Sequence, residues 1–160
     1  VRTHQIPRPF SGMTVFENVF VAAAHGAGLK RAEAYDQAIA AIELCGMLNV
    51  SNRRAETLGL LDRKRLELAR ALAAKPDLLL LDEIGGGLTD AEASELVATI
   101  LELRRRNIGI VWIEHIVHLL LQVAERLICM DAGKIIADGT PAAVMADPEV
   151  IRAYLGGGPK

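Results

Sequence analysis

The chain has 160 residues, and 51% of them are hydrophobic, which is enough to form the core of one domain and excludes an intrinsically disordered protein. Its 18 basic and 20 acidic residues leave a formal net charge of −2, so the overall charge gives no reason to expect binding to nucleic acid or to an anionic membrane. The longest apolar runs are well short of the roughly 18 residues that a membrane-spanning helix needs.

Helices are predicted for the first half of the chain. Thr14, followed three residues later by Glu17, has the spacing of a capping box and opens the first helix. A second helix spans residues 30–45, and a third ends before Pro76, because proline cannot continue a helix. Helical spacing predicts that the buried faces of the first two helices carry Phe16, Val19, Phe20 and Ala23, and Tyr35, Ala38, Ile39 and Ile42.

A basic cluster lies within the third helix, where Arg63, Lys64 and Arg65 follow one another. Arginine and lysine side chains are almost never fully buried unless they are paired. We therefore interpret the three residues as the solvated face of an amphipathic helix.

From residue 77 onward, the pattern changes to strands that alternate with helices. Leu78 to Leu81 is a short, wholly apolar run, which is typical of a strand buried on both faces of a parallel sheet. Thr89 and Glu92 form a second capping box, which opens a helix with Ala93, Leu96, Val97, Ile100 and Leu101 on its buried side. The remaining predicted elements are a strand over 108–113, a helix over 117–124, a hairpin of 127–130 with 134–137, and two short closing helices. This order predicts an α/β fold with a mainly parallel sheet, preceded by a helical subdomain.

The two cysteines give no sign of a disulfide or a metal site. Cys45 and Cys129 belong to no Cys-x-x-Cys motif and to no Cys/His cluster. We therefore expect a reduced, cytoplasmic protein with two ordinary core cysteines.

Polar side chains follow both predicted strands of the parallel sheet. Asp82 and Glu83 come directly after the first strand, and Glu114 and His115 follow the second. Ligands of open α/β sheets bind beyond the carboxyl ends of the strands, where a carboxylate can anchor nucleotide-bound magnesium or accept a proton from an attacking water. The alternative is that Asp82 and Glu83 only begin a loop and that His115 is structural.

These residues and their order resemble the ATP-binding subunits of ABC transporters. Residues 78–83, 87–90 and 113–115 are similar to the Walker B, D-loop and switch-histidine motifs of that family. Residues 2–5 and 13–19 resemble its Q-loop region, and residues 65–72 match the helix that follows the ABC signature. The tail, residues 139–156, is most similar to the branched-chain amino-acid uptake branch.

The resemblance implies a fold, a set of segments and a pair of ligands. The fold is an incomplete P-loop NTPase core of the ABC ATPase type, and the ligands are ATP and Mg²⁺. Residues 1–12 would form the Q-loop region, 13–76 the helical subdomain with a degenerate signature motif, and 77–160 the C-terminal part of the ATPase core.

The resemblance also implies roles for individual residues. Gln5 would contact magnesium or the lytic water and sense the permease, and Asp82 would hold magnesium. Glu83 would be the general base, and His115 would bind the γ-phosphate. Thr89 and Asp90 would lie where the D-loop crosses the dimer interface. Such groups around one site suit phosphoryl transfer, which depends on positioning and charge neutralisation.

Two departures from the family pattern bear on activity. The phosphate-binding motif G-x-x-x-x-G-K-[ST] does not occur in the 160 residues, which begin at Val1 without Met. We therefore expect that the first third of the subunit is missing and that this chain alone binds nucleotide at most weakly and does not hydrolyse it. The signature L-S-G-G-Q aligns with Leu58–Asp62, where Gly59, Leu60, Leu61 and Asp62 lack the serine hydroxyl and would leave only backbone amides for a phosphate. Ile84 and Ile116 replace the usual proline and aspartate without removing a catalytic atom.

From the resemblance we expect a parent protein that powers import by hydrolysing MgATP at a dimer interface, on the inner face of the cell membrane. Its partners would be transmembrane permease subunits, contacted near Arg8 and Phe10, and a second ATP-binding subunit, with no nucleic acid. Two alternatives stay open: an ABC ATPase with no role in transport, and a non-enzymatic interaction module or truncated regulatory fragment.

Overall fold

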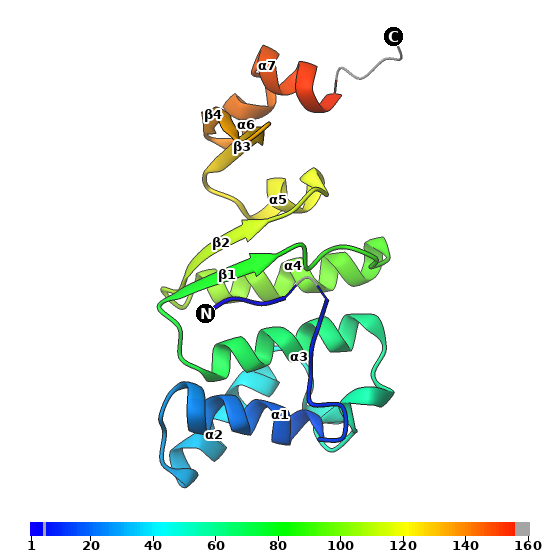
Figure 1. Cartoon of the computed structure of the whole chain (residues 1–160), viewed down its shortest axis with the longest axis vertical. Coiled ribbons are helices and arrows are strands. Elements are labelled where there is room, and N and C mark those ends of the chain that lie inside the picture. The colour runs from blue at the N-terminus through cyan, green and yellow to red at the C-terminus, as the bar shows by residue number, and fades with distance from the viewer. Residues whose placement is uncertain (5, 156–160) are drawn as a thin grey trace. The chain divides into compact units, whose positions relative to one another are not determined.

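The computed structural model describes residues 1–4 and 6–155, and these residues form two compact units, which meet in the sequence between Ile116 and Val117. Figure 1 shows the elements in the order that the sequence predicts: helices first, then strand, helix, strand, helix and hairpin, with short helices at the end. The mixed helical and parallel-sheet architecture confirms the predicted fold class. The proposed division at residues 12 and 76 stays a prediction.

The helical part of the first unit contains α1 (Val15–Val21), α2 (Arg31–Leu44) and α3 (Leu60–Ala73). A π-helical turn, Ala22–Gly26, continues α1. The predicted capping box at the start of α1 is present, because the Thr14 hydroxyl accepts from the Glu17 amide and the Glu17 carboxylate accepts from the Thr14 amide. The fully buried residues that join these helices include Val15, Val19, Ile42, Leu66 and Leu68.

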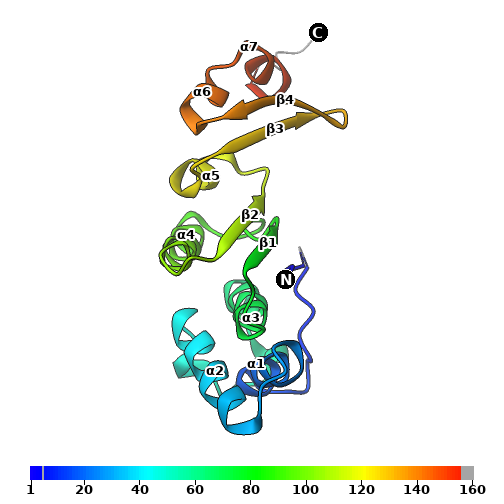
Figure 2. The ribbon, with the colours of Figure 1, turned by 90° about the vertical axis from the view of Figure 1, so that its left-hand side faces the viewer.

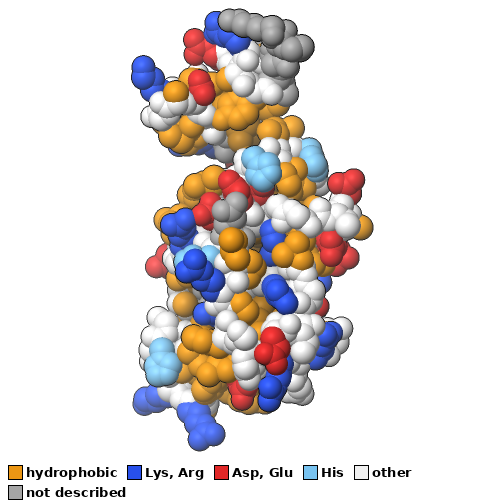
Figure 3. All heavy atoms as spheres, turned by 45° about the vertical axis from the view of Figure 1, so that its right-hand side comes forward, with side chains coloured by type: hydrophobic (Ala, Val, Ile, Leu, Met, Phe, Trp, Pro, Cys, Tyr) orange, Lys and Arg blue, Asp and Glu red, His pale blue; other side chains and the backbone are white. Residues whose placement is uncertain are grey.

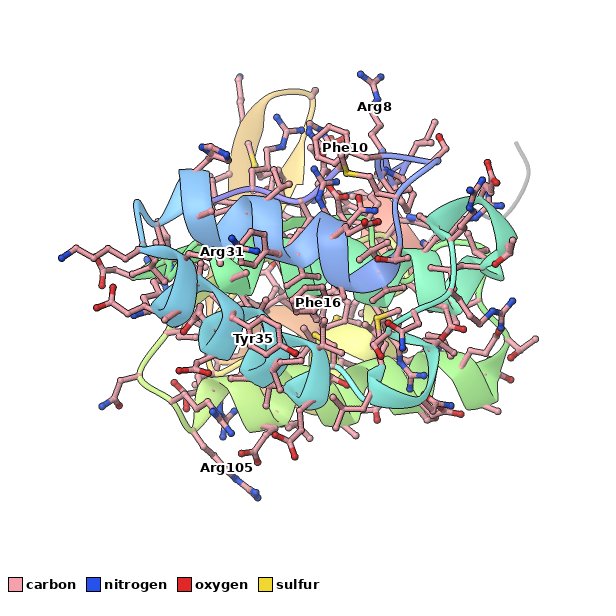
Figure 4. The ribbon with its side chains drawn as sticks, turned by 90° about the horizontal axis from the view of Figure 1, so that it is seen from below. Arg8, Phe10, Phe16, Arg31, Tyr35 and Arg105 are labelled. Atoms are coloured by element: carbon pink, nitrogen blue, oxygen red, sulfur yellow. The ribbon has the colours of Figure 1, made fainter. Side chains whose placement is uncertain are left out.

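Tyr35 differs from the prediction, because its side chain is 54% exposed and does not enter the core between the helices. Its ring instead lies against the edge of the helical part, with 5.0 Å between its centroid and that of Phe16 (Figure 4). The buried positions of α2 belong mostly to small residues, so a tyrosine on this helix is accommodated only at its rim.

Basic and acidic side chains are interspersed on the face of the molecule shown in Figure 3.

The sheet of the first unit is built on two parallel strands, β1 (Leu78–Asp82) and β2 (Gly109–Ile113), linked by α4 (Asp90–Arg104). Their register puts Asp82 opposite Ile113, so both strands end at the same edge (Figure 2). The capping box at Thr89 and Glu92 opens α4 as predicted.

The chain's first residues add to this sheet along β1. The Thr3 amide donates to the Leu80 carbonyl over 2.9 Å, and the Leu80 amide donates to the Val1 carbonyl over 2.8 Å. These bonds form a parallel bridge between Arg2 and Leu80, which brings the first residues of the chain to the end of β1.

The expectation that the first strand of the sheet is buried on both faces is wrong for this chain. In β1, Leu79 and Leu81 are buried, but Leu78 and Leu80 alternate with them and are exposed. In β2, Ile113 is 61% exposed. Successive side chains of a strand point to opposite faces, so helix packing on one face buries only every second residue.

The second unit contains α5 (Val117–Val123), β3 (Leu127–Asp131), β4 (Lys134–Gly139), α6 (Pro141–Met145) and α7 (Pro148–Val150), followed by a π-helical turn, Ile151–Leu155. The antiparallel pairing of β3 with β4 confirms the predicted hairpin, and an irregularity interrupts its register between Cys129 and Met130. Ala132 and Gly133 both have positive φ at the turn, as the two central residues of a type I′ hairpin turn do. Arg126 and Asp138 add a two-bonded ion pair across the hairpin.

Within the described residues, no helix has both the length and the apolar character needed to cross a membrane. Cys45 is buried as predicted, and its burial raises the pKa of the thiol to about 12. Cys129 differs from the prediction, because it lies on the partly exposed hairpin.

Candidate functional site

The candidate site is built at the ends of β1 and β2, beginning with Asp82. Its carboxylate accepts a hydrogen bond of 2.5 Å from the Arg2 guanidinium, which the bridge between the first residues and β1 brings to this point. The pair joins residues 80 positions apart in the sequence. Gln5, the other predicted magnesium contact, lies outside the described residues.

Glu83 follows Asp82 at the point where the chain turns out of the sheet. Its backbone has φ +46°, in the left-handed region, which costs roughly 1–2 kcal/mol for a residue with a side chain. The Glu83 amide donates to the Ile113 carbonyl over 2.8 Å, so the turn stays hydrogen-bonded to the end of β2. Strain of this kind persists only where neighbouring contacts hold it in place, and it is common at functional sites.

The end of β2 brings His115 close to Glu83. The His115 Nδ1 atom lies 3.8 Å from Glu83 Oε2 and 3.4 Å from Glu114 Oε1. The imidazole itself is largely exposed, with 66% of the side chain accessible. An exposed imidazole beside a carboxylate is able to reach an anionic ligand from solvent.

Glu114 is a site residue to which the sequence analysis gave no role. Its side chain is fully buried, and Oε2 accepts from the Gly85 amide over 2.9 Å. It thus fixes the turn after Glu83 from the side of β2. Its position directly before His115 was the signal in the sequence that could have indicated a site residue. Its role depends on a hydrogen bond from Gly85, which is 29 residues away and could not be inferred from neighbouring residues.

Lys64 overturns the interpretation of residues 63–65 as a solvated face. Its side chain is only 5% exposed, and the ammonium donates to the carbonyls of Ile84 over 2.8 Å and Gly86 over 2.5 Å. Burial lowers the pKa of Lys64, while the nearby charges of Glu114 and Glu83 act in the opposite direction. The position is buried because α3 packs beneath the turn that follows β1.

The residues aligned with the ABC signature form the start of α3. Gly59 is the N-cap and supplies no side-chain cap, while Leu60, Leu61 and Asp62 form the first turn. Asp62 lies 3.8 Å from Arg65 of the same helix. A methyl group at Gly87 would lie 3.1 Å from Leu60 Cδ2, so this turn packs directly against the loop between β1 and α4.

Thr89 and Asp90 stand at the start of α4 and are both exposed. The Thr89 hydroxyl accepts from the Glu92 amide and lies 2.8 Å from its carboxylate, which makes it part of the helix cap. Asp90 is the first residue of the helix and leaves its carboxylate accessible to solvent.

Asp82 has the right chemistry for a magnesium ligand. Among the described residues, no group of three or more His, Cys, Asp or Glu side chains is arranged to hold one. Magnesium bound to a nucleotide usually takes one or two carboxylates and keeps phosphate and water as its other ligands. A single carboxylate at the end of β1 fits that kind of ion.

A second polar network holds the segment that follows residue 5. Asn18, fully buried in α1, accepts from the Phe10 amide and donates to the carbonyls of Phe10 and Thr14. The Arg70 guanidinium lies 5.1 Å from the centroid of the Phe10 ring and donates to the Arg8 carbonyl. The Arg8 side chain extends away from the ribbon, as Figure 4 shows. Residues 8–10 thus form an ordered, accessible surface.

Comparisons of the sequence with known families give two matches. Residues 1–85 match the family described as ABC transporter. Residues 134–160 match the family described as branched-chain amino acid ATP-binding cassette transporter.

Individual relatives agree with these matches. The chain is 39% identical to the high-affinity branched-chain amino acid transport ATP-binding protein LivG of Escherichia coli, over 98% of this chain and 67% of LivG. It is 35% identical to BraF of Pseudomonas aeruginosa, with the same coverage, and 37% identical to the lipopolysaccharide export protein LptB of Haemophilus influenzae, over 92% of this chain and 61% of LptB.

Solved structures show the same likeness in three dimensions. A nucleotide-free ATP-binding cassette from an ABC transporter aligns with a TM-score of 0.80 at 26% identity, over 96% of this chain and 67% of that one. The structure of cbiO1 from Clostridium perfringens, part of an ABC transporter complex, aligns with a TM-score of 0.84 at 26% identity, over 95% of this chain and 61% of that one.

Proposed function

Since the chain belongs to the ATP-binding subunits of ABC transporters, we propose that it carries the hydrolytic part of a site that powers the import of branched-chain or other amino acids. The match of residues 134–160 and the names of LivG and BraF support this substrate class. LptB, an export protein, is also similar, but its alignment covers less of this chain.

The reaction that we propose is attack of water on the γ-phosphorus of ATP. Glu83 accepts the proton of that water, and the phosphoanhydride bond breaks to leave ADP and phosphate. His115 donates a hydrogen bond to the γ-phosphate. The observation that carries the proposal is the short distance, 3.8 Å, between Glu83 and the exposed imidazole of His115 at the end of β2. A base and a phosphate-binding group that act on one substrate have to lie around the same reacting phosphate, and neighbouring side chains at one edge of the sheet can do so.

Magnesium, when bound, would neutralise charge on the phosphates, and Asp82 is the residue that we propose to hold it. Because Asp82 pairs with Arg2 in this structure, binding of the ion competes with that ion pair. Gln5 is proposed as a second contact, since it follows this segment in the sequence.

We also propose that this chain alone does not turn over ATP. The motif G-x-x-x-x-G-K-[ST], whose amides and lysine hold the β- and γ-phosphates, does not occur in its 160 residues. The start of α3, Gly59–Asp62, offers backbone amides but also the carboxylate of Asp62, which repels a phosphate.

The partners that we propose follow from the exposed surfaces. Thr89 and Asp90 are accessible at the start of α4 and would face a second ATP-binding subunit. Arg8 and Phe10 would contact a transmembrane permease, which puts the protein on the cytoplasmic face of the membrane. Alanine at Arg8 or Phe10 is expected to uncouple hydrolysis from transport in the assembled transporter, and unchanged transport would contradict this assignment.

The experiment that tests the hydrolytic role is the ATPase activity of the assembled transporter that contains this chain. Glu83→Gln keeps the size of the side chain and removes the base, so the rate is expected to fall about 100-fold or more while ATP binding is retained. Glu43→Gln, at an exposed position near the end of α2, is the matched control and should keep the full rate. Full activity of Glu83→Gln would contradict the proposal.

A further inference from the structure

The buried ammonium of Lys64 is a feature that the proposed reaction does not use. Lys64 extends from α3 and ends between the carbonyls of Ile84 and Gly86, at 2.8 and 2.5 Å. A buried cation is costly unless hydrogen bonds and opposite charges compensate for it. The carbonyls supply the hydrogen bonds here, and the negative charges of Glu114 and Glu83 favour the charged form of Lys64.

The turn that Lys64 holds begins at Glu83, the proposed base. Glu83 has a left-handed backbone, which by itself favours relaxation to another conformation. Glu114 holds the turn from β2 through the Gly85 amide, and Lys64 holds it from α3 through the carbonyls on either side of Gly85. Glu114 thus accepts from the amide of Gly85, and Lys64 donates to the carbonyls of its two neighbours.

Lys64 also connects this turn to the start of its own helix. Leu60, one helical turn earlier, packs on Gly87 in the same loop. Residues 60–64 and 83–87 are therefore joined at two points, one polar and one apolar. These contacts connect the first turn of α3 to the backbone beside Glu83.

We propose that Lys64 is a positioning residue, whose ammonium fixes the turn at residues 84–86 and thereby the orientation of the Glu83 carboxylate. This inference rests on the proposed role of Glu83 as the base. With this role for Lys64, residues 60–64 at the start of α3 and residues 83–87 keep a fixed arrangement relative to each other.

The first test measures amide hydrogen exchange in this chain. Lys64→Met keeps the length of the side chain and removes its charge and donors, so exchange in residues 83–88 is expected to accelerate about tenfold, with α2 unchanged. Lys64→Arg restores a donor and is expected to return most of the protection. Arg63→Met, at the adjacent exposed position, is the matched control.

Unchanged exchange in residues 83–88, or equal acceleration throughout residues 1–116, would overturn the proposal, because the latter is the result of a general loss of stability. If Lys64→Met does not fold, Lys64→Gln, which keeps an uncharged donor, is compared with Lys64→Arg by the same criterion.

The second test is made on the assembled transporter. Lys64→Met is expected to lower kcat about tenfold with little change in the KM for ATP, and Lys64→Arg to recover most of the loss. Normal kcat in Lys64→Met would overturn the positioning role. A failure of the proposed function gives a different result. Glu83→Gln would then keep its ATPase activity, while Lys64→Met would still accelerate amide exchange in residues 83–88.

Discussion

Replacing Asn18 with alanine is the change whose effect on the free energy of unfolding follows most directly from the structure. Asn18 is fully buried, and its side-chain amide makes four hydrogen bonds to the backbone of the segment that leads into α1. It accepts from the Phe10 amide at 2.8 Å and donates to the carbonyls of Thr14 at 2.9 Å, Phe10 at 3.1 Å and Met13 at 3.4 Å. Alanine removes all four bonds at once.

The expected loss follows from these distances. Three of the bonds are short, and each contributes about 1 kcal/mol, so the free energy of unfolding should fall by about 3 kcal/mol. Asn18→Asp should cost more at neutral pH, because a carboxylate would then face the carbonyls of Phe10 and Thr14. The residue would keep its acceptor and lose its donors.

Urea unfolding followed by the fluorescence of Trp112 measures this loss. Trp112 is the chain's single tryptophan and lies in β2, so it reports on the unit that contains Asn18. With an m-value of about 1.5 kcal/mol/M, the midpoint should fall by about 2 M. Asn52→Ala, at an exposed position, is the control and should leave the midpoint unchanged. A midpoint for Asn18→Ala close to that of the unmodified chain would refute the reasoning.

Two further predictions concern the cysteines and the hairpin. Because the pKa of Cys45 is raised to about 12, iodoacetamide at pH 8 should modify Cys129 and spare Cys45 in the native chain, and mass spectrometry that finds Cys45 modified first would contradict this. The hydrogen bond from Arg126 lowers the pKa of Asp138 in the folded chain. The stabilisation that Asp138 contributes is therefore complete above about pH 4, which is the pKa of an aspartate in the unfolded chain, and it is lost as the pH falls through the lower pKa of the folded chain. The stability difference between the chain and Asp138→Asn should therefore shrink on acidification, and a difference that is constant from pH 7 to pH 2 would disprove the role of the ion pair.

Local patterns in the sequence predicted the elements well, because each depends on residues close to one another in the chain. The capping boxes at Thr14 and Thr89 need only the glutamate three residues later. The parallel pairing of β1 and β2 put Glu83 and His115 at one edge, which the sequence predicted from the polar residues that follow each strand.

Long-range contacts explain what the sequence did not predict. The burial of Lys64 depends on carbonyls 20 and 22 residues away, and a basic residue on an amphipathic helix normally indicates a solvated face. The pairing of Arg2 with Asp82 depends on the bridge that the first residues make with β1. The exposed alternate face of β1 shows that a wholly apolar run indicates a strand but does not determine what covers each side.

Calorimetric titration of MgATP into this chain, with Glu83→Gln in parallel, tests the central claim most directly. We expect no binding heat for either protein up to millimolar ATP, because the motif that would hold the phosphates does not occur in the 160 residues. Micromolar binding would contradict the account, because another part of the chain would then have to hold the phosphates.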